Sequence, residues 1–181
     1  MKILTVPNPI LREKSKTIKK IDNKTKELIK LMEKSVNLRG IGLSAVQIGE
    51  PIRLFIVRLA KEKTYTSFIN PVIVQLSTEL LNNVVDSKNP YEGCLSVPKY
   101  WGEVNRHKSI EISYDTIVNN EVVHKQGLFT SFSSIVIQHE YDHLEGILFI
   151  DRILQQNGIL YYATGKKDEK GKEIWERVKL T

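Results

Sequence analysis

The sequence predicts an α+β fold in which antiparallel strands wrap around a central helix. Two stretches, residues 22–39 and 130–145, have apolar residues at helical spacing. Runs of residues typical of strands occur at 52–59, 68–76, 110–118 and 121–125. The pair Asn119-Asn120 separates the last two runs and favours a hairpin between them. No internal repeat or boundary is visible in the sequence, so we expect one domain over residues 1–181.

Local signals define the first elements. Pro7 and Pro9 interrupt any helix in the first 20 residues, which we expect to form an extended arm. In the first helix, Asp22 or Asn23 can cap the N-terminus, and Gly40 can end the helix. Lysines occupy the face of this helix opposite its apolar residues. Because no aromatic residue is interleaved with them, a solvated face is favoured over a nucleic-acid-binding patch.

Later segments carry turn and bend signals. Three glycines within residues 40–51 indicate that the backbone approaches another group closely, and the segment lacks the GKS or GKT of a phosphate loop. Asn70-Pro71 predicts that its strand is bent or lies at a sheet edge. Residues 82–93 are expected to form a loop. The tail predicts a hairpin between 159–164 and 173–180, or a short helix over the second of these segments.

The composition excludes several classes of protein. Hydrophobic residues make up 41% and charged residues 27% of the chain, which is ordinary for a soluble globular protein. The single cysteine, Cys94, cannot form an internal disulfide, which indicates a reducing compartment or a special use for that thiol. No apolar run approaches the ~20 residues of a membrane span and no signal-peptide pattern is present, so we expect a cytoplasmic protein with no membrane partner. The net charge of +6 permits weak attraction to ribosomes but indicates no specific nucleic acid.

The sharpest chemical signal is His139-Glu140-Tyr141-Asp142-His143. Two histidines at i and i+4 lie on one face of a helix, so both imidazoles can bind one metal ion. Glu140 is near enough to reach a water molecule on that ion. The alternative is a pair of core or helix-capping histidines. We expect this HExxH helix to be the central, metal-binding helix of the fold.

A metal site on this helix needs a third ligand. No histidine follows His143, so the downstream donors are glutamates, namely Glu145, Glu169, Glu173 and Glu176. Upstream lies Cys94, which follows a glycine in a polar segment, a poor place for a small buried hydrophobe. A thiolate is also a strong ligand for zinc or iron. Cys94, His139 and His143 would leave a fourth position open, as catalytic sites do.

Three ordered motifs resemble those of the peptide deformylase family. The family's GxGxAAxQ loop, EGC(L/I)S loop and QHExDHLxG helix correspond to Gly40–Gln47, Glu92–Ser96 and Gln138–Gly146. The second and third motifs match at every defined position, and the first departs once, with Ser44 in place of alanine. The resemblance is close over residues 40–151 and loose in the N-terminal arm.

The resemblance implies removal of the formyl group from the N-terminal formyl-methionine of newly made polypeptides. In that chemistry a metal-bound hydroxide attacks the formyl carbon, Glu140 acts as general acid and base, and Gln47 with the Leu95 backbone N–H holds the oxyanion. The three ligands suit zinc, iron, cobalt and nickel, and the resemblance favours Fe(II) in cells. The expected partners are formyl-methionyl nascent peptides, and the basic surface is compatible with a weak ribosome contact.

The same motifs indicate how a substrate would bind. Backbone at Ile41, Gly42 and Gly93 can pair with an extended peptide, as a strand added to a sheet edge. The candidates for an apolar methionine pocket are Ile41, Phe132, Val136 and the stem of Glu92. For Phe132 and Val136, an ordinary core position is an equal alternative.

Two charged residues beside the proposed ligands, and two alternative functions, also need to be considered. By the family pattern Glu92 pairs with Arg106, whereas Asp142 is expected to be solvated. A zincin-type peptidase is the alternative enzyme, although no later histidine is present to complete its site. A structural metal site in a binding module would need a fourth ligand from His107, His124 or a carboxylate.

Overall fold

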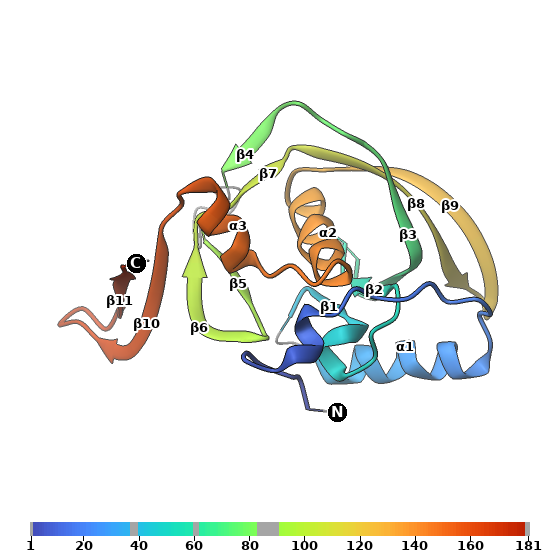
Figure 1. Cartoon of the computed structure of the whole chain (residues 1–181), viewed down its shortest axis with the longest axis horizontal. Helices are drawn as coiled ribbons and strands as arrows, with labels where there is room; N and C mark the ends of the chain where they lie inside the picture. The colour runs from blue at the N-terminus through green and yellow to red at the C-terminus, as the bar shows by residue number, and fades with distance from the viewer. Residues whose placement is uncertain (1, 37–39, 60–61, 83–90, 180–181) are drawn as a thin grey trace.

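The computed structural model describes residues 2–36, 40–59, 62–82 and 91–179 (Figure 1). In these ranges the helices are α1 (Asn23–Val36), α2 (Ser131–Leu144) and α3 (Phe149–Gln156), and 3₁₀ turns lie at Pro9–Arg12 and Ala45–Ile48. The strands are β1 (Gly42–Ser44), β2 (Leu54–Val57), β3 (Thr66–Leu76), β4 (Leu80–Asn82), β5 (Glu92–Cys94), β6 (Val97–Gly102), β7 (Asn105–His107), β8 (Ser109–Val118), β9 (Glu121–Thr130), β10 (Leu160–Lys167) and β11 (Glu173–Val178).

The larger sheet has the strand order β1-β2-β3-β8-β9, and its neighbouring strands are antiparallel. All four residues of β2 are buried, because helices cover both of its faces. Leu54 and Ile56 pack into the same apolar cluster as α1, while Phe55 and Val57 pack into the cluster of α2. Side chains alternate across a strand, so one short apolar run supplies both halves of the core.

Two sequence signals in this sheet are confirmed. Asn119 and Asn120 both have positive φ, 49° and 67°, as the tight turn between β8 and β9 requires. The hairpin pairs ten residues on each strand, so β9 runs five residues beyond the expected 121–125. In β3, Asn70 has φ 48° and the pairing register shifts after Ile69, which gives the bend expected at Asn70-Pro71.

The second sheet has the order β11-β10-β6-β5, and β4 pairs separately with β7. The tail forms the expected hairpin, β10 with β11, rather than a helix. The expectation of a loop over 82–93 is wrong at its ends, because residue 82 belongs to β4 and Glu92 and Gly93 belong to β5. Residues 83–90 lie outside the described part of the chain.

Helix α2 occupies the centre of the molecule, with strands curving around it (Figure 1). Its buried residues form an unbroken run from Ser134 to Glu140 and resume at Asp142, so α2 has no solvated face along most of its length. The predicted α+β fold with a central helix is therefore confirmed. Helix α1 falls within the expected 22–39, of which residues 37–39 are not described.

The N-terminal arm is extended apart from its 3₁₀ turn, and it ties two motifs together. The backbone N–H of Leu4 donates to the carbonyl of Gln47 over 2.8 Å, and that of Val6 donates to Ser96 over 2.9 Å. These bonds hold the Gly-rich segment and the segment after Cys94 beside each other. Among the described helices, none is long and apolar enough to cross a bilayer.

Candidate metal centre and active site

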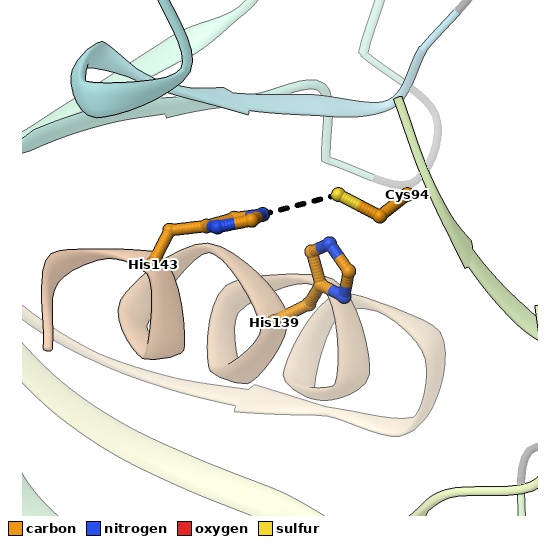
Figure 2. A group of neighbouring side chains, drawn as sticks. All are labelled: Cys94, His139 and His143. Carbon is orange, nitrogen blue, oxygen red and sulfur yellow. Dashed lines mark hydrogen bonds between the residues drawn. The ribbon is translucent and has the colours of Figure 1, made fainter. Parts of the chain in front are cut away.

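Cys94 on β5 and two histidines on α2 converge on one point (Figure 2). One donor atom from each of Cys94, His139 and His143 lies within 4.8 Å of the others. Sγ of Cys94 is 3.2 Å from Nε2 of His143. The histidines are one helical turn apart, and their ring planes are nearly perpendicular at 81°. The structure thus brings together the three ligands expected from the sequence.

This donor set fits a single divalent metal ion. Ligands at ~2.3 Å for sulfur and ~2.0–2.1 Å for nitrogen lie ~3.3–3.7 Å apart around a tetrahedral ion, close to the spacing of Cys94 and His143. Burial, and then the charge of His139, hold the pKa of His143 well below its ordinary value. A neutral imidazole offers the lone pair that a metal needs. Glu145, a downstream alternative, instead pairs with Arg53 and Lys14.

Glu92 orients His139. Its Oε1 lies 2.6 Å from Nδ1 of His139, which turns Nε2 of that ring toward Cys94 (Figure 2). Burial alone would raise the pKa of Glu92, but the charges of Arg106 and His139 hold that pKa well below its ordinary value. Burial would likewise lower the pKa of His139, but Glu92 and then Cys94 raise it. The carboxylate of Glu92 is therefore ionised and fixes one ring nitrogen of His139.

A buried ion-pair network supports this carboxylate. Arg106, on β7, donates from Nη2 and Nε to Glu92 over 2.6 and 3.1 Å, so the expected Glu92–Arg106 pair is confirmed. Arg106 also donates to Oδ2 of Asp142 over 2.6 Å, and Arg152 on α3 donates to the same carboxylate. The expectation of a solvated Asp142 is wrong, because this residue is only 5% exposed. Arg106, from a strand distant in the sequence, and Arg152 from α3 supply the opposite charge that a buried carboxylate needs.

Glu140 lies next to the three ligand residues and contacts β1. Burial is the main cause that raises its pKa to about 7, and the charge of His139 opposes the rise. Oγ of Ser44 lies 2.9 Å from Oε2 of Glu140. Ser44 is the position that departs from the family motif. Its contact with Glu140 was not predicted, because the two residues are far apart in the sequence and only the fold brings them together. The side chain of Glu140 can therefore exchange a proton near neutral pH while Ser44 holds it.

The amide of Gln47 faces the same point. Its Oε1 accepts from the backbone N–H of Ser44 over 2.8 Å, which turns its NH₂ group toward the ligands. That group lies 3.5 Å from Sγ of Cys94 and 3.1 Å from Oγ of Ser96. Leu95 follows Cys94 in the chain and lines the cavity described next. The side-chain amide of Gln47 and the backbone of Leu95 thus lie beside the cluster of Cys94, His139 and His143.

A cavity of about 540 Å³ opens beside these groups. Its lining includes all the substrate-binding candidates taken from the sequence, namely Ile41, Gly42, Glu92, Gly93, Phe132 and Val136. Phe132 is 37% exposed, as a surface pocket residue would be, whereas Val136 is 8% exposed and also packs in the core. Three further aromatic residues in the lining were not anticipated from the sequence: Tyr91, Tyr100 and Trp101.

Two sheet edges border the cavity. β1 is the edge strand of the larger sheet and carries Gly42, and β5 is the edge strand of the second sheet and carries Gly93. Among the described strands, each of these two has a sheet neighbour on one side only, and such an edge can pair with an extended chain. The cavity thus combines a cysteine–histidine cluster, a buried carboxylate and two open strand edges.

Fold and site together place the chain among metal-dependent hydrolases that carry an HExxH helix. Comparison with known proteins identifies the family. The family model of polypeptide deformylase matches residues 1–158. The chain is 37% identical over 157 residues to peptide deformylase of Brucella suis, covering 83% of both chains. It is 40% identical over 153 residues to that of Pseudothermotoga lettingae, covering 84% of this chain and 82% of the relative. The chain belongs to the polypeptide deformylase family.

Solved structures agree with this assignment. Peptide deformylase 1B of Arabidopsis thaliana, crystallised with an inhibitor, superposes with a TM-score of 0.73 at 34% identity, over 86% of this chain and 83% of that one. Peptide deformylase of Thermotoga maritima superposes with a TM-score of 0.72 at 32% identity, over 83% and 95% of the two chains. The family is metal-dependent, in agreement with the cysteine–histidine cluster.

Proposed function

We propose that this protein removes the formyl group from the N-terminal formyl-methionine of newly synthesised polypeptides. The observation that carries the proposal is the convergence of Cys94, His139 and His143 beside Glu140 in a family of deformylases. Cys94, His139 and His143 would hold one divalent ion. Bound there, the ion would supply positive charge beside the formyl oxygen and lower the pKa of a nearby water.

Glu140 is the proton carrier in this proposal. Its carboxylate takes a proton from the attacking water and delivers it to the amine that leaves when the formyl C–N bond breaks. The pKa of about 7 suits both transfers. The hydroxyl of Ser44 donates to Oε2, while Oε1 lies against Gly42, which lines the cavity together with Glu140.

Gln47 and Leu95 stabilise the oxyanion that forms as water adds to the formyl carbon. The NH₂ group of Gln47 is oriented by its bond to Ser44, and the backbone N–H of Leu95 follows the ligand Cys94 directly. Donors that are already in place cost no reorganisation during the reaction, which is why such groups stabilise a transition state efficiently.

The substrate binds as an extended chain along the open edges. Backbone groups of Ile41, Gly42 and Gly93 pair with its main chain, and that pairing does not depend on the sequence of the nascent chain. The methionine side chain enters the apolar part of the cavity near Phe132 and Val136, with the stem of Glu92. An enzyme that acts on many nascent chains needs this combination of one selective pocket and general main-chain recognition.

We further propose Fe(II) as the ion in cells, with zinc, nickel or cobalt able to replace it, because one thiolate and two imidazoles suit all four. The enzyme acts in the cytoplasm, where formyl-methionyl chains emerge, and its excess of basic residues permits a weak ribosome contact.

One assay tests the proposal. The metal-loaded protein is expected to release formate from formyl-Met-Ala-Ser and to leave acetyl-Met-Ala-Ser intact, with one metal ion per chain by elemental analysis. Cleavage of an internal peptide bond would indicate a peptidase instead. Metal binding without release of formate would indicate a structural site.

A further inference from the structure

The C-terminal hairpin β10–β11 lies beyond residue 158, where the match to the family model ends. β10 pairs with β6, and β6 pairs with β5, so the hairpin widens the sheet whose edge strand carries Cys94. Figure 1 shows it projecting from the body of the molecule beside β6. A segment that the family model does not match is therefore continuous with the edge of the candidate active site.

One face of this sheet carries an aromatic cluster. Directly paired residues of antiparallel strands share a face, and Gly93 pairs with Trp101, which pairs with Tyr161. Trp175 on β11 and Tyr91 before β5 join them: the ring centroid of Trp175 is 5.7 Å from that of Trp101 and 5.6 Å from that of Tyr91. Tyr91 also lies 4.7 Å from Tyr161. The hairpin thus supplies half of the cluster.

The cluster reaches the cavity through two of its members. Tyr91 and Trp101 belong to the cavity lining, and Trp175 contacts both of them. Gly93 explains how the indole of Trp101 comes so close to the site: a Cβ at position 93 would lie 2.4 Å from Cε3 of Trp101. The indole therefore rests on the backbone of the residue that precedes Cys94.

We propose that Trp175 is a positioning residue that holds Trp101 and Tyr91 as an aromatic wall of the cavity. The wall binds an aromatic or large apolar side chain in the residues that follow the formyl-methionine. This inference rests on the deformylase function proposed above. A peptide paired with β5 presents alternate side chains to the face that carries Trp101, and aromatic rings bind such side chains through their faces and edges.

The test compares peptides as well as variants. Full-length, metal-loaded wild type, Trp175→Ala and Trp175→Phe are assayed on formyl-Met-Ala-Ala, formyl-Met-Phe-Ala and formyl-Met-Ala-Phe. In Trp175→Ala, the KM for at least one phenylalanine-containing peptide should rise about 3- to 10-fold, the range that one aromatic contact supplies. The kcat values and the KM for formyl-Met-Ala-Ala should not change. Trp175→Phe should restore most of the lost selectivity, because it restores a ring.

Ile174→Ala is the matched control. Ile174 is the neighbour of Trp175 on β11, so its side chain points to the opposite face, and it is 38% exposed. This variant should keep the wild-type KM for all three peptides. If Trp175→Ala proves poorly folded by circular dichroism, Trp175→Leu fills the same space without a ring and takes its place in the comparison.

Fluorescence gives a second readout. Trp101 and Trp175 are the two tryptophans of the chain, so its intrinsic emission reports on the cluster. Titration with the product peptide that shows the KM effect, Met-Phe-Ala or Met-Ala-Phe, should quench or shift this emission in the wild type. The remaining Trp101 emission in Trp175→Phe should respond similarly, and that in Trp175→Ala should respond only at higher peptide concentration.

The outcomes separate the two proposals. A wild type that does not deformylate formyl-Met-Ala-Ala would overturn the function, and with it the reaction in which the wall takes part. A wild type that is active, with a Trp175→Ala variant that is folded and has unchanged KM values for both phenylalanine-containing peptides, would overturn the wall alone. An equal rise in KM for all three peptides would also overturn it, because that result indicates a general disturbance of β5.

Discussion

A Cβ atom at position 42 would lie 2.4 Å from Oε1 of Glu140, so this carboxylate lies in space that only glycine leaves free. Ser44, at the other end of the same short strand, contacts the second carboxylate oxygen over 2.9 Å. Glu140 is therefore fixed as much by β1 as by its own helix. Placement of this carboxylate, the proposed proton carrier, depends on the Gly-rich segment, which lies nearly 100 residues away in the sequence.

Gly42→Ala should displace the carboxylate of Glu140 and leave the metal ligands in place. A shift of about 1 Å at a reacting group can cost on the order of 10²-fold, so we expect kcat to fall roughly 10- to 100-fold with metal content unchanged. Formate release and elemental analysis measure the two quantities. Gly127→Ala, on exposed β9, is the matched glycine control and should keep the wild-type kcat. Full activity in Gly42→Ala would refute the assigned position of Glu140.

Glu140→Gln should retain the metal and lose at least about 10²-fold in kcat, because the amide cannot accept and deliver the proton. The side chain keeps its size, so circular dichroism should match the wild type. Glu145→Gln is the control. Glu145 lies at the C-terminal end of α2 and pairs with Arg53 and Lys14, away from Cys94, His139 and His143. Near-normal turnover of Glu140→Gln at saturating formyl-peptide would contradict its role.

Local features of this fold could be predicted from the sequence. Helical spacing identified α2 to within a residue at each end, and Asn119-Asn120 identified the β8–β9 turn, because each depends on residues close together in the chain. The i, i+4 histidines were predictable for the same reason. The grouping of Cys94 with them joins β5 to α2 across more than 40 residues, so it rested on the ligand chemistry of a lone thiolate and on the family resemblance rather than on spacing.

Features that depend on distant partners were missed. Asp142 was expected in solvent because the charge of a helix residue predicts exposure, yet Arg106, 36 residues earlier, neutralises it inside the fold. β5 was read as loop because its residues are typical of turns, and it becomes a strand only by pairing with β6. The contact of Trp175 with Trp101 was likewise not predictable, because it forms only when β10 pairs with β6 and brings β11 near. Sequence patterns do not contain these tertiary pairings.

Removal of the metal should destabilise the folded protein and be reversible. An ion that binds only the native state stabilises it by mass action, about 2.7 kcal/mol when its concentration is 100 times its Kd. Treatment with a chelator should therefore lower the unfolding temperature by several degrees, and added zinc or nickel should restore it. X-ray absorption of the reloaded protein should show sulfur at ~2.3 Å and nitrogen at ~2.0–2.1 Å. A spectrum without sulfur would exclude Cys94 as a ligand.

Arg106→Ala should unfold far more readily than the wild type. Arg106 is 4% exposed, so its removal takes from buried Glu92 the donor of two hydrogen bonds and from buried Asp142 one of its two arginine partners. Breaking a buried ion pair in this way costs about 3–5 kcal/mol. Urea denaturation measures the loss, with metal affinity as a second readout, because Glu92 would no longer be held against His139.

The control for Arg106 is its near neighbour Lys108. Lys108 pairs with Glu79 over 2.8 Å, but both side chains are about half exposed or more. An exposed pair contributes only about 0–1 kcal/mol, so Lys108→Ala should change the free energy of unfolding little and leave metal affinity unchanged. Equal losses in the two variants would mean that burial of the Arg106 network adds nothing. A larger loss in Arg106→Ala, together with weaker metal binding, is the result that the geometry of Glu92 requires.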